Sequence, residues 1–300
     1  MAESIAEFFT EHFQAHRHET AYRQRRGYRT ESFSYGEVLE MAFGFACKLE
    51  ARGIAKGDRV MVWGENCAEW VAVFFGCALR GVIVVPMDDG SAADFGLRVF
   101  QRVGAKLLVG SRRHVHECAA AGHSIAFLNL EDLAQVPGRE RALPLKVALG
   151  CDDTLQIVFT SGTTAEPKGV VITHGNVLAN IAPLEREMRG YMKYERLVHP
   201  LRFLNLLPLS HVFGQFLGMF LPPLLGAMVI FQEELKPSEV IRTIRRERVS
   251  VPGAALNEPG GLGRTRDRPD AGFRHLHECG SGGAGGRGLL PRRLGSVTAQ

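Results

Sequence analysis

Residues 157–172 limit the fold of this chain more than any other stretch. They read Ile-Val-Phe-Thr-Ser-Gly-Thr-Thr-Ala-Glu-Pro-Lys-Gly-Val-Val-Ile, which is an apolar run, a polar loop that ends in lysine, and a second apolar run. The first run predicts a buried strand. The loop can turn backbone N–H groups and hydroxyls toward one point, and the lysine adds a mobile positive charge, as a polyphosphate needs. The stretch therefore predicts a nucleotide-using enzyme of the α/β class.

The spacing excludes two common phosphate loops. A Walker A loop needs G-x-x-x-x-G-K-[ST], but here no glycine directly precedes Lys168, and Gly169 stands where the magnesium-binding hydroxyl belongs. The dinucleotide fingerprint G-x-G-x-x-G does not occur at this strand end. Two alternatives remain, a nucleotide loop of another kind and a Ser/Thr-rich turn that binds nothing.

Two blocks of the sequence resemble the adenylate-forming enzymes, the family of acyl-CoA synthetases, peptide-synthetase adenylation domains and luciferases. Residues 160–169 match the family signature T-S-G-[TS]-T-G-x-P-K-G except at Ala165, where glycine is usual. Residues 205–214, Asn-Leu-Leu-Pro-Leu-Ser-His-Val-Phe-Gly, resemble the family's P-[LM]-x-H-x-x-G element. Taken alone, His211 reads as an ordinary histidine of an apolar segment. Read with the loop upstream, it is a candidate site residue.

The resemblance implies roles for the matched positions. The residues implied to hold the β- and γ-phosphates of ATP are Thr160, Ser161, Gly162, Thr163, Thr164 and Lys168. Thr160 is also implied to contact Mg²⁺, and Lys168 and His211 are implied to be the catalytic side chains. His211 and Gly214 are implied to border the acyl pocket.

The same resemblance implies ATP-dependent activation of a carboxylic acid to acyl-AMP, followed by transfer of the acyl group to coenzyme A. The apolar residues around His211 suggest a fatty acid, with an aryl acid as the next choice. Full-length relatives also carry an aromatic-Gly-x-Thr-Glu motif and a mobile domain with a catalytic lysine, neither of which can be placed in this sequence. The alternatives to an active ligase are an inactive nucleotide- or acyl-binding remnant and an unstable structural fragment.

The amino-terminal part shows an alternation of helix and strand signals. Ser34 and Glu37 have the spacing of a capping box, which predicts a helix that runs to residue 52. A strand is predicted at 60–63 and a helix at 68–79. The continuous apolar run at 81–87 is typical of a strand buried on both faces of a parallel sheet. With the resemblance, this order predicts the front part of the large N-terminal domain of an adenylate-forming enzyme, with βαβ layers and mostly parallel sheets.

Residues 203–231 contain no Asp, Glu, Lys or Arg. By length alone, this uncharged segment could cross a bilayer. Prolines and polar residues interrupt the segment, so we expect a strand at 203–207, a helix at 212–221 and a strand at 227–231. Near the amino terminus, Ser4 and Glu7 predict a helix start, and the apolar residues that follow are expected to pack in the core. A peripheral membrane contact, made to reach a lipid substrate, stays open.

The amino-acid composition limits the classes of partner and the cellular compartment. The net charge of +4 gives no sign of a nucleic-acid partner. The six cysteines form no C-x-x-C pair, so we expect reduced thiols and not a disulfide framework or zinc site. The first twenty residues lack the order of a secretory signal. Together these features predict a cytoplasmic protein and leave the oligomeric state open, and the partner that the family resemblance implies is a small-molecule acid.

The carboxyl-terminal part has a different character. Residues 280–288 read Gly-Ser-Gly-Gly-Ala-Gly-Gly-Arg-Gly, and such a composition cannot offset the entropy of fixing its backbone. We therefore expect residues 1–251 to be an incomplete AMP-binding (adenylation) domain. We expect residues 252–300 to be a Gly/Arg-rich tail that is disordered or comes from a shifted reading frame.

Overall fold

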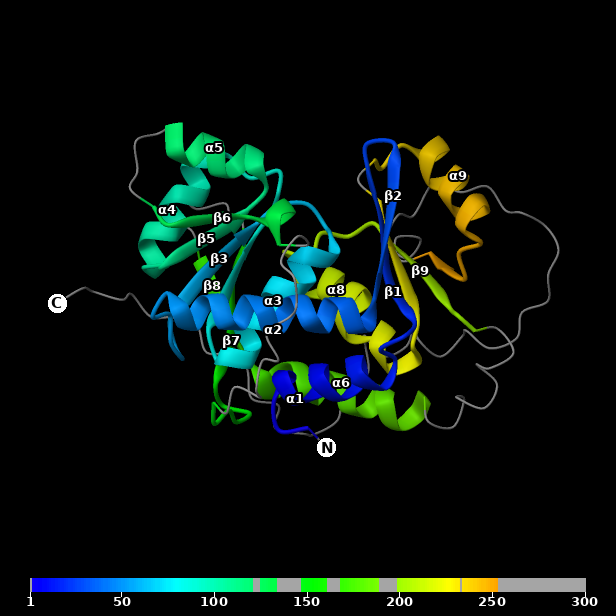
Figure 1. Ribbon diagram of the computed structural model, residues 1–300, viewed down its shortest axis with the longest axis horizontal. Helices are drawn as coiled ribbons and strands as arrows, with labels where there is room; N and C mark the ends of the chain where they lie inside the picture. The colour runs from blue at the N-terminus through cyan, green and yellow to red at the C-terminus, as the bar shows by residue number, and fades with distance from the viewer. Residues whose placement is uncertain are drawn as a thin grey trace, which may run out of the picture.

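Two β-sheets with a pair of helices between them organise the chain in the computed structural model (Figure 1). The structure describes residues 2–120, 125–133, 147–160, 168–188, 199–232 and 234–252. Sheet A has the strand order β11-β9-β10-β1-β2, and sheet B has the order β6-β5-β3-β4-β7-β8. The strands of sheet A are β1 (Thr20–Arg26), β2 (Arg29–Ser34), β9 (Arg202–Asn205), β10 (Met228–Phe231) and β11 (Val251–Pro252). The strands of sheet B are β3 (Arg59–Trp63), β4 (Ile83–Met87), β5 (Leu107–Gly110), β6 (Phe127–Asn129), β7 (Thr154–Thr160) and β8 (Lys168–Thr173).

Both sheets are mostly parallel. In the part of the chain that the structure describes, the antiparallel pairs are β1–β2 in sheet A and β7–β8 in sheet B, and all other neighbours are parallel. Parallel strands need crossover connections, which helices supply here. The α/β fold with mostly parallel sheets, predicted from the sequence, is confirmed.

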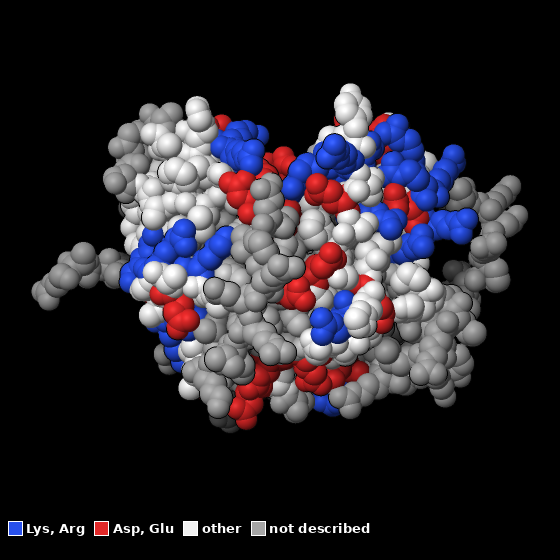
Figure 2. Space-filling model, in the orientation of Figure 1, with Lys and Arg blue, Asp and Glu red and all other residues white. Residues whose placement is uncertain are grey.

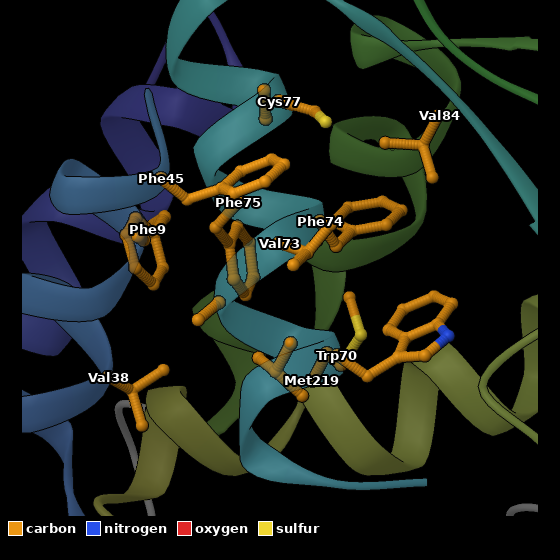
Figure 3. Close-up of a cluster of buried hydrophobic side chains, with 14 of the residues drawn as sticks. Phe9, Val38, Phe45, Trp70, Val73, Phe74, Phe75, Cys77, Val84 and Met219 are labelled. Carbon is orange, nitrogen blue, oxygen red and sulfur yellow. The ribbon is translucent and has the colours of Figure 1, made fainter. Parts of the chain in front are cut away.

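The central helices are α2 (Tyr35–Ala51) and α3 (Ala68–Arg80), and they lie side by side between the sheets (Figure 1). Every residue of α3 from Ala68 to Leu79 is buried, as expected for a helix that is apolar on all faces apart from Glu69 in its first turn. Its aromatic side chains meet those of neighbouring elements in the main core (Figure 3). Phe75, for example, stacks on Phe9 with ring centroids 4.0 Å apart.

Outer helices cover the remaining faces of the sheets. Helices α4 (Ala93–Val103) and α5 (Arg112–Ala120) lie on the outer side of sheet B, where Trp63, Met87 and Leu97 belong to a second core cluster. Helix α9 (Pro237–Glu247) covers the outer side of sheet A over Leu204 and Ile230. The other helices are α1 (Ile5–Ala15), η1 (Leu130–Asp132), α6 (His174–Met188), α8 (Val212–Gln215), η2 (Phe216–Phe220) and η3 (Pro222–Leu225).

Several local predictions are confirmed. Ser34 and Glu37 form both hydrogen bonds of the capping box at the start of α2, and Gly53 follows that helix in a left-handed conformation. The Ser4 side chain caps α1, and the phenylalanines of that helix are buried in the core. The apolar run at 81–87 is only partly a strand, because Gly81 adopts a left-handed conformation (φ 64°) that ends α3 before β4 begins.

The apolar segment at 203–231 divides into β9, a helical stretch and β10, as the sequence predicted. The helical stretch is not one continuous α-helix, since a short α-helix is followed by a π-helical turn and then a 3₁₀ turn that contains Pro222 and Pro223. Within the described residues, no helix combines the length and the apolar character that crossing a membrane requires.

Candidate functional site

A cleft of about 190 Å³ lies where strands of both sheets end. Residues that follow β3 and β4 form one wall, and residues that follow β9 and β10 form the other. The lining residues are Gly64, Glu65, Asn66, Asp88, Asp89, Leu206, Pro208, Ser210, Gln232 and Leu235. In open α/β sheets ligands bind outside the carboxyl ends of the strands, at the point where the strand order reverses. Sheet B reverses its order around β3 and sheet A around β9, so the cleft occupies this position for both sheets.

His211 stands beside this cleft at the start of α8. Its Nε2 atom lies 3.5 Å from Oδ2 of Asp88, and 58% of its side chain is exposed. The Ser210 hydroxyl donates a hydrogen bond of 3.3 Å to the same oxygen. The structure thus places His211 next to a residue that lines the cleft, and its catalytic and acyl-pocket roles stay predictions. The sequence did not identify Asp88, whose carboxylate holds Ser210 and attracts His211 when the imidazole is protonated.

Amide side chains fix the loop that leads to His211. Asn66 donates to the Leu207 carbonyl and accepts from the Leu209 N–H, both at 2.8 Å. Gly214 is buried one turn further on, where a Cβ would lie 2.1 Å from the Pro208 carbonyl oxygen. Gly214 thus allows the short helix to pack against the loop. It does not belong to the residues that line the cleft, and its role in an acyl pocket stays a prediction.

Trp63 and His114 support the opposite wall. The two rings stack with centroids 4.2 Å apart, and the buried His114 ring contacts Oδ1 of Asp89 through Nε2 at 2.8 Å. This hydrogen bond holds the pKa of Asp89 below its ordinary value, against the opposing effect of burial. The cleft therefore keeps a negative charge at Asp89 near neutral pH.

The predicted phosphate loop is anchored by the β7–β8 hairpin. Thr160 ends β7 directly opposite Lys168, which begins β8 and is exposed. A Cβ at Gly169 would lie 2.9 Å from the Ile157 side chain, so a glycine allows the two strands to approach closely. The loop itself lies outside the described residues, and this applies to Ser161, Gly162, Thr163, Thr164 and the side chain of Thr160. Their phosphate and Mg²⁺ roles stay predictions.

A pair of glutamines connects the two blocks that the sequence singled out. Gln156 on β7 and Gln215 on α8 are both fully buried and exchange two hydrogen bonds, of 2.7 and 2.8 Å. The structure therefore brings the strand that leads into the predicted phosphate loop into direct contact with the helix that begins after His211. Sequence reasoning missed this pair. The available signal was a single polar residue, Gln156, within an apolar strand.

A second cavity, of about 290 Å³, lies between β1, β10 and α9. Arg23, Arg25, Arg242 and Arg246 line it, and Figure 2 shows Lys and Arg gathered over α9 and the β1–β2 hairpin. Glu247 accepts hydrogen bonds from Arg23 at 2.7 Å and Arg246 at 2.8 Å. Burial alone would raise the pKa of Glu247, but these hydrogen bonds and positive charges hold it below its ordinary value. The arginines of this cavity are thus largely engaged by carboxylates of the chain.

Comparison with known families gives one match over most of the chain. The model described as "AMP-binding enzyme" matches residues 9–255. Among curated proteins, 4-coumarate–CoA ligase 3 of Arabidopsis thaliana is 26% identical over 248 residues, which are 76% of this chain and 42% of the relative. Crotonobetaine/carnitine–CoA ligase of Salmonella paratyphi C is 35% identical over 161 residues, covering 48% of this chain and 31% of the relative. The chain therefore spans less than half the length of these relatives.

Solved structures show the same fold. The N-terminal domain of FACL13 from Mycobacterium tuberculosis superimposes with a TM-score of 0.68 at 24% identity, covering 84% of this chain and 62% of that one. The O-succinylbenzoate coenzyme A synthetase (MenE) of Bacillus subtilis, solved with AMP, gives a TM-score of 0.59 at 21% identity, covering 82% and 60%. At these identities the likeness concerns the fold alone.

Proposed function

Because the chain belongs to the AMP-binding enzyme family, we propose that it takes part in the ATP-dependent activation of a carboxylic acid. In the first step a carboxylate oxygen attacks the α-phosphorus of ATP, the bond to the β-phosphate bridging oxygen breaks, and pyrophosphate leaves. In the second step the thiolate of coenzyme A attacks the acyl carbon, and AMP leaves as the thioester forms. One observation carries this proposal, the contact between the strand that enters the phosphate loop and the helix that His211 precedes.

In this proposal the loop binds the phosphates. The side chains proposed for this role are Thr160, Ser161, Thr163, Thr164 and Lys168, together with the backbone of Gly162. Preorganised N–H groups, hydroxyls and an ammonium group stabilise the charge that develops on the leaving pyrophosphate. The Thr160 hydroxyl is an oxygen donor of the kind that Mg²⁺ takes alongside phosphate oxygens, and the ion would offset further negative charge.

We also propose which class of carboxylic acid is activated. The sequence suggested a fatty acid, but the cleft beside His211 presents the carboxylates of Glu65, Asp88 and Asp89. Two of the relatives are named for 4-coumarate and for crotonobetaine or carnitine, and neither is a long-chain fatty acid. We therefore rank a small acid with an aromatic or polar body above a long-chain fatty acid.

Calorimetric titration of the full chain with Mg·ATP tests nucleotide binding. We expect saturable binding that the substitution Lys168→Ala weakens by about tenfold or more, because a charge-assisted contact to phosphate is lost. Lys106→Ala is the matched control, since Lys106 is also an exposed lysine but pairs with Asp58 at 2.8 Å. Equal affinity of Lys168→Ala and wild type would contradict the proposed phosphate site.

Pyrophosphate exchange then tests catalysis. The chain is incubated with ATP, labelled pyrophosphate and one acid at a time from fatty, aryl and small polar classes. Exchange that depends on a particular acid would identify the substrate class. Saturable Mg·ATP binding without exchange for any acid would assign the chain a binding role without turnover.

A further inference from the structure

The buried glutamine pair, Gln156 and Gln215, forms a closed ring of two hydrogen bonds. Nε2 of each residue donates to Oε1 of the other, at 2.7 and 2.8 Å, and neither residue is exposed to solvent. We call this pair the amide bridge. Each donor and acceptor of the ring is satisfied by the opposite side chain, so the ring exists only when both glutamines are at their observed positions.

The amide bridge joins parts of the site that are far apart in the chain. Gln156 lies on β7, four positions before Thr160, where the predicted phosphate loop begins. Gln215 is the last residue of α8, four positions after His211. Nε2 of Gln215 also donates to the Leu209 carbonyl at 2.9 Å, so it holds the loop that carries His211 as well as the helix.

Hydrophobic packing does not by itself require amide side chains at positions 156 and 215. The neighbours of Gln156 along the strand, Leu155 and Ile157, are apolar and buried, and an apolar residue would bury as well there. Apolar contacts are non-directional, whereas hydrogen bonds fix distance and angle. A buried amide that loses its partner is left unsatisfied, which opposes any shift of α8 relative to β7.

We infer that Gln156 and Gln215 are positioning residues that hold His211 at a set distance from the end of β7, where the predicted phosphate loop begins. The inference rests on the proposed function, in which the acid lies beside His211 and the phosphates lie on the loop. The carboxylate must meet the α-phosphorus in line, and small errors in such an approach slow a reaction strongly. The amide bridge sets this approach because it makes β7 and α8 one rigid unit.

Hydrogen–deuterium exchange of the chain without ligand gives the first test. In Gln156→Met the strand keeps a side chain of similar size, but Gln215 loses its partner. We expect exchange of the amides at 206–215 to rise about tenfold, while α2 and α3 keep wild-type protection. Gln24→Met is the matched control, because Gln24 is also a buried glutamine but bonds to Glu69 and to the Ala68 N–H, neither of which belongs to α8 or β7.

The outcomes separate positioning from general stability. A rise confined to 206–215 in Gln156→Met, and not found in Gln24→Met, supports the inference. Unchanged exchange at 206–215, or an equal rise across the whole chain as in a globally destabilised protein, overturns it.

A second measurement links the bridge to the nucleotide. We expect Mg·ATP to slow exchange at 206–215 in the wild type, and we expect Gln156→Met to lose this remote effect while its Kd for Mg·ATP stays within about threefold. Persistence of the remote effect in Gln156→Met would overturn the inference. A wild-type chain that binds no Mg·ATP would instead contradict the proposed function, and the ligand-free exchange would still decide whether the bridge couples β7 to α8.

Discussion

His174 shows how one buried side chain makes the stability of this chain depend on pH. Its ring is fully buried at the start of α6, and Nδ1 accepts a hydrogen bond of 3.1 Å from the Ile5 N–H. An accepting nitrogen carries no proton, so the folded structure needs the neutral ring. Burial lowers the pKa of His174 from its ordinary value to about 4, with Asp153 acting in the opposite direction and Lys56 in the same one.

We therefore expect the free energy of unfolding to fall as the pH drops from about 6.5 toward about 4. In this pH range the His174 side chain is protonated in the unfolded chain but not in the folded chain. This difference lowers the free energy of unfolding by up to about 3 kcal/mol near pH 4. Above about pH 6.5 the imidazole of His174 is neutral in both the folded and the unfolded chain, so it contributes no pH dependence to stability. Urea unfolding at several pH values checks this, with His174→Gln as the variant without the titrating group. A pH dependence in His174→Gln as steep as in the wild type would contradict the assignment.

Gly214 is a second residue whose environment predicts a large effect. An added Cβ would lie 2.1 Å from the Pro208 carbonyl oxygen, and the other nearest atoms are also backbone atoms of that loop, which leaves little room to relax. We expect Gly214→Ala to lower the free energy of unfolding by about 1–3 kcal/mol. Gly44→Ala is the control, because Gly44 lies within α2 with open space around it, and alanine there should stabilise by about 0.5–1 kcal/mol. Equal effects of the two substitutions in urea unfolding would contradict the packing argument.

At the scale of elements, α3 is held to sheet A by one buried charge. Glu69 has no solvent exposure, and its carboxylate accepts hydrogen bonds from Arg26 at 2.9 Å and from Gln24 at 3.1 Å. The other end of the same helix has an ion pair between Arg80 and Glu50 at 3.1 Å, in which 54% of the Glu50 side chain is exposed. The two pairs allow a comparison of buried and exposed charges on one helix.

We expect Glu69→Ala to destabilise the chain by about 2 kcal/mol, because Gln24 and Arg26 lose their buried acceptor. Partial exposure of Arg26 and the remaining contacts of both side chains with Glu31 keep the loss below that of a fully buried pair. Glu50→Ala should cost less than about 1 kcal/mol, since solvent screens an exposed pair. Chemical denaturation of both variants measures the difference. A loss for Glu50→Ala as large as that for Glu69→Ala would show that burial does not decide the effect.

The elements also show what the sequence could and could not predict. The capping box at Ser34 and the apolar stripe of α1 depend on residues a few positions apart, so local patterns predicted them correctly. The amide bridge joins residues 59 positions apart, and no local period indicates which strand lies next to which helix. The same holds for Asp88, which meets His211 only because β4 and β9 end at one cleft.

At the scale of the whole molecule, the match to the family covers residues 9–255, and the boundary expected at residue 252 stays a prediction. The predictions for the tail lie outside the described residues. We propose that the reading frame changes near codon 252. Translation of the gene in its other two frames beyond that codon should then show an aromatic-Gly-x-Thr-Glu sequence. If neither frame encodes such a sequence, the proposal is wrong.

The cleft is lined by residues that follow strands, at positions 64–66, 88, 89, 206, 208, 210, 232 and 235, whereas the hydrophobic core clusters consist mainly of residues from the strands and helices themselves. Changes at exposed lining residues such as Leu235 therefore leave the core packing intact, whereas Asn66 is needed to hold the loop that leads to His211. Residues that contact a ligand are thus largely distinct from residues that stabilise the fold, so substitutions at the cleft can change specificity while the fold stays intact. For the same reason, the cleft-lining residues are suitable positions for exchanging short segments between homologues in protein engineering.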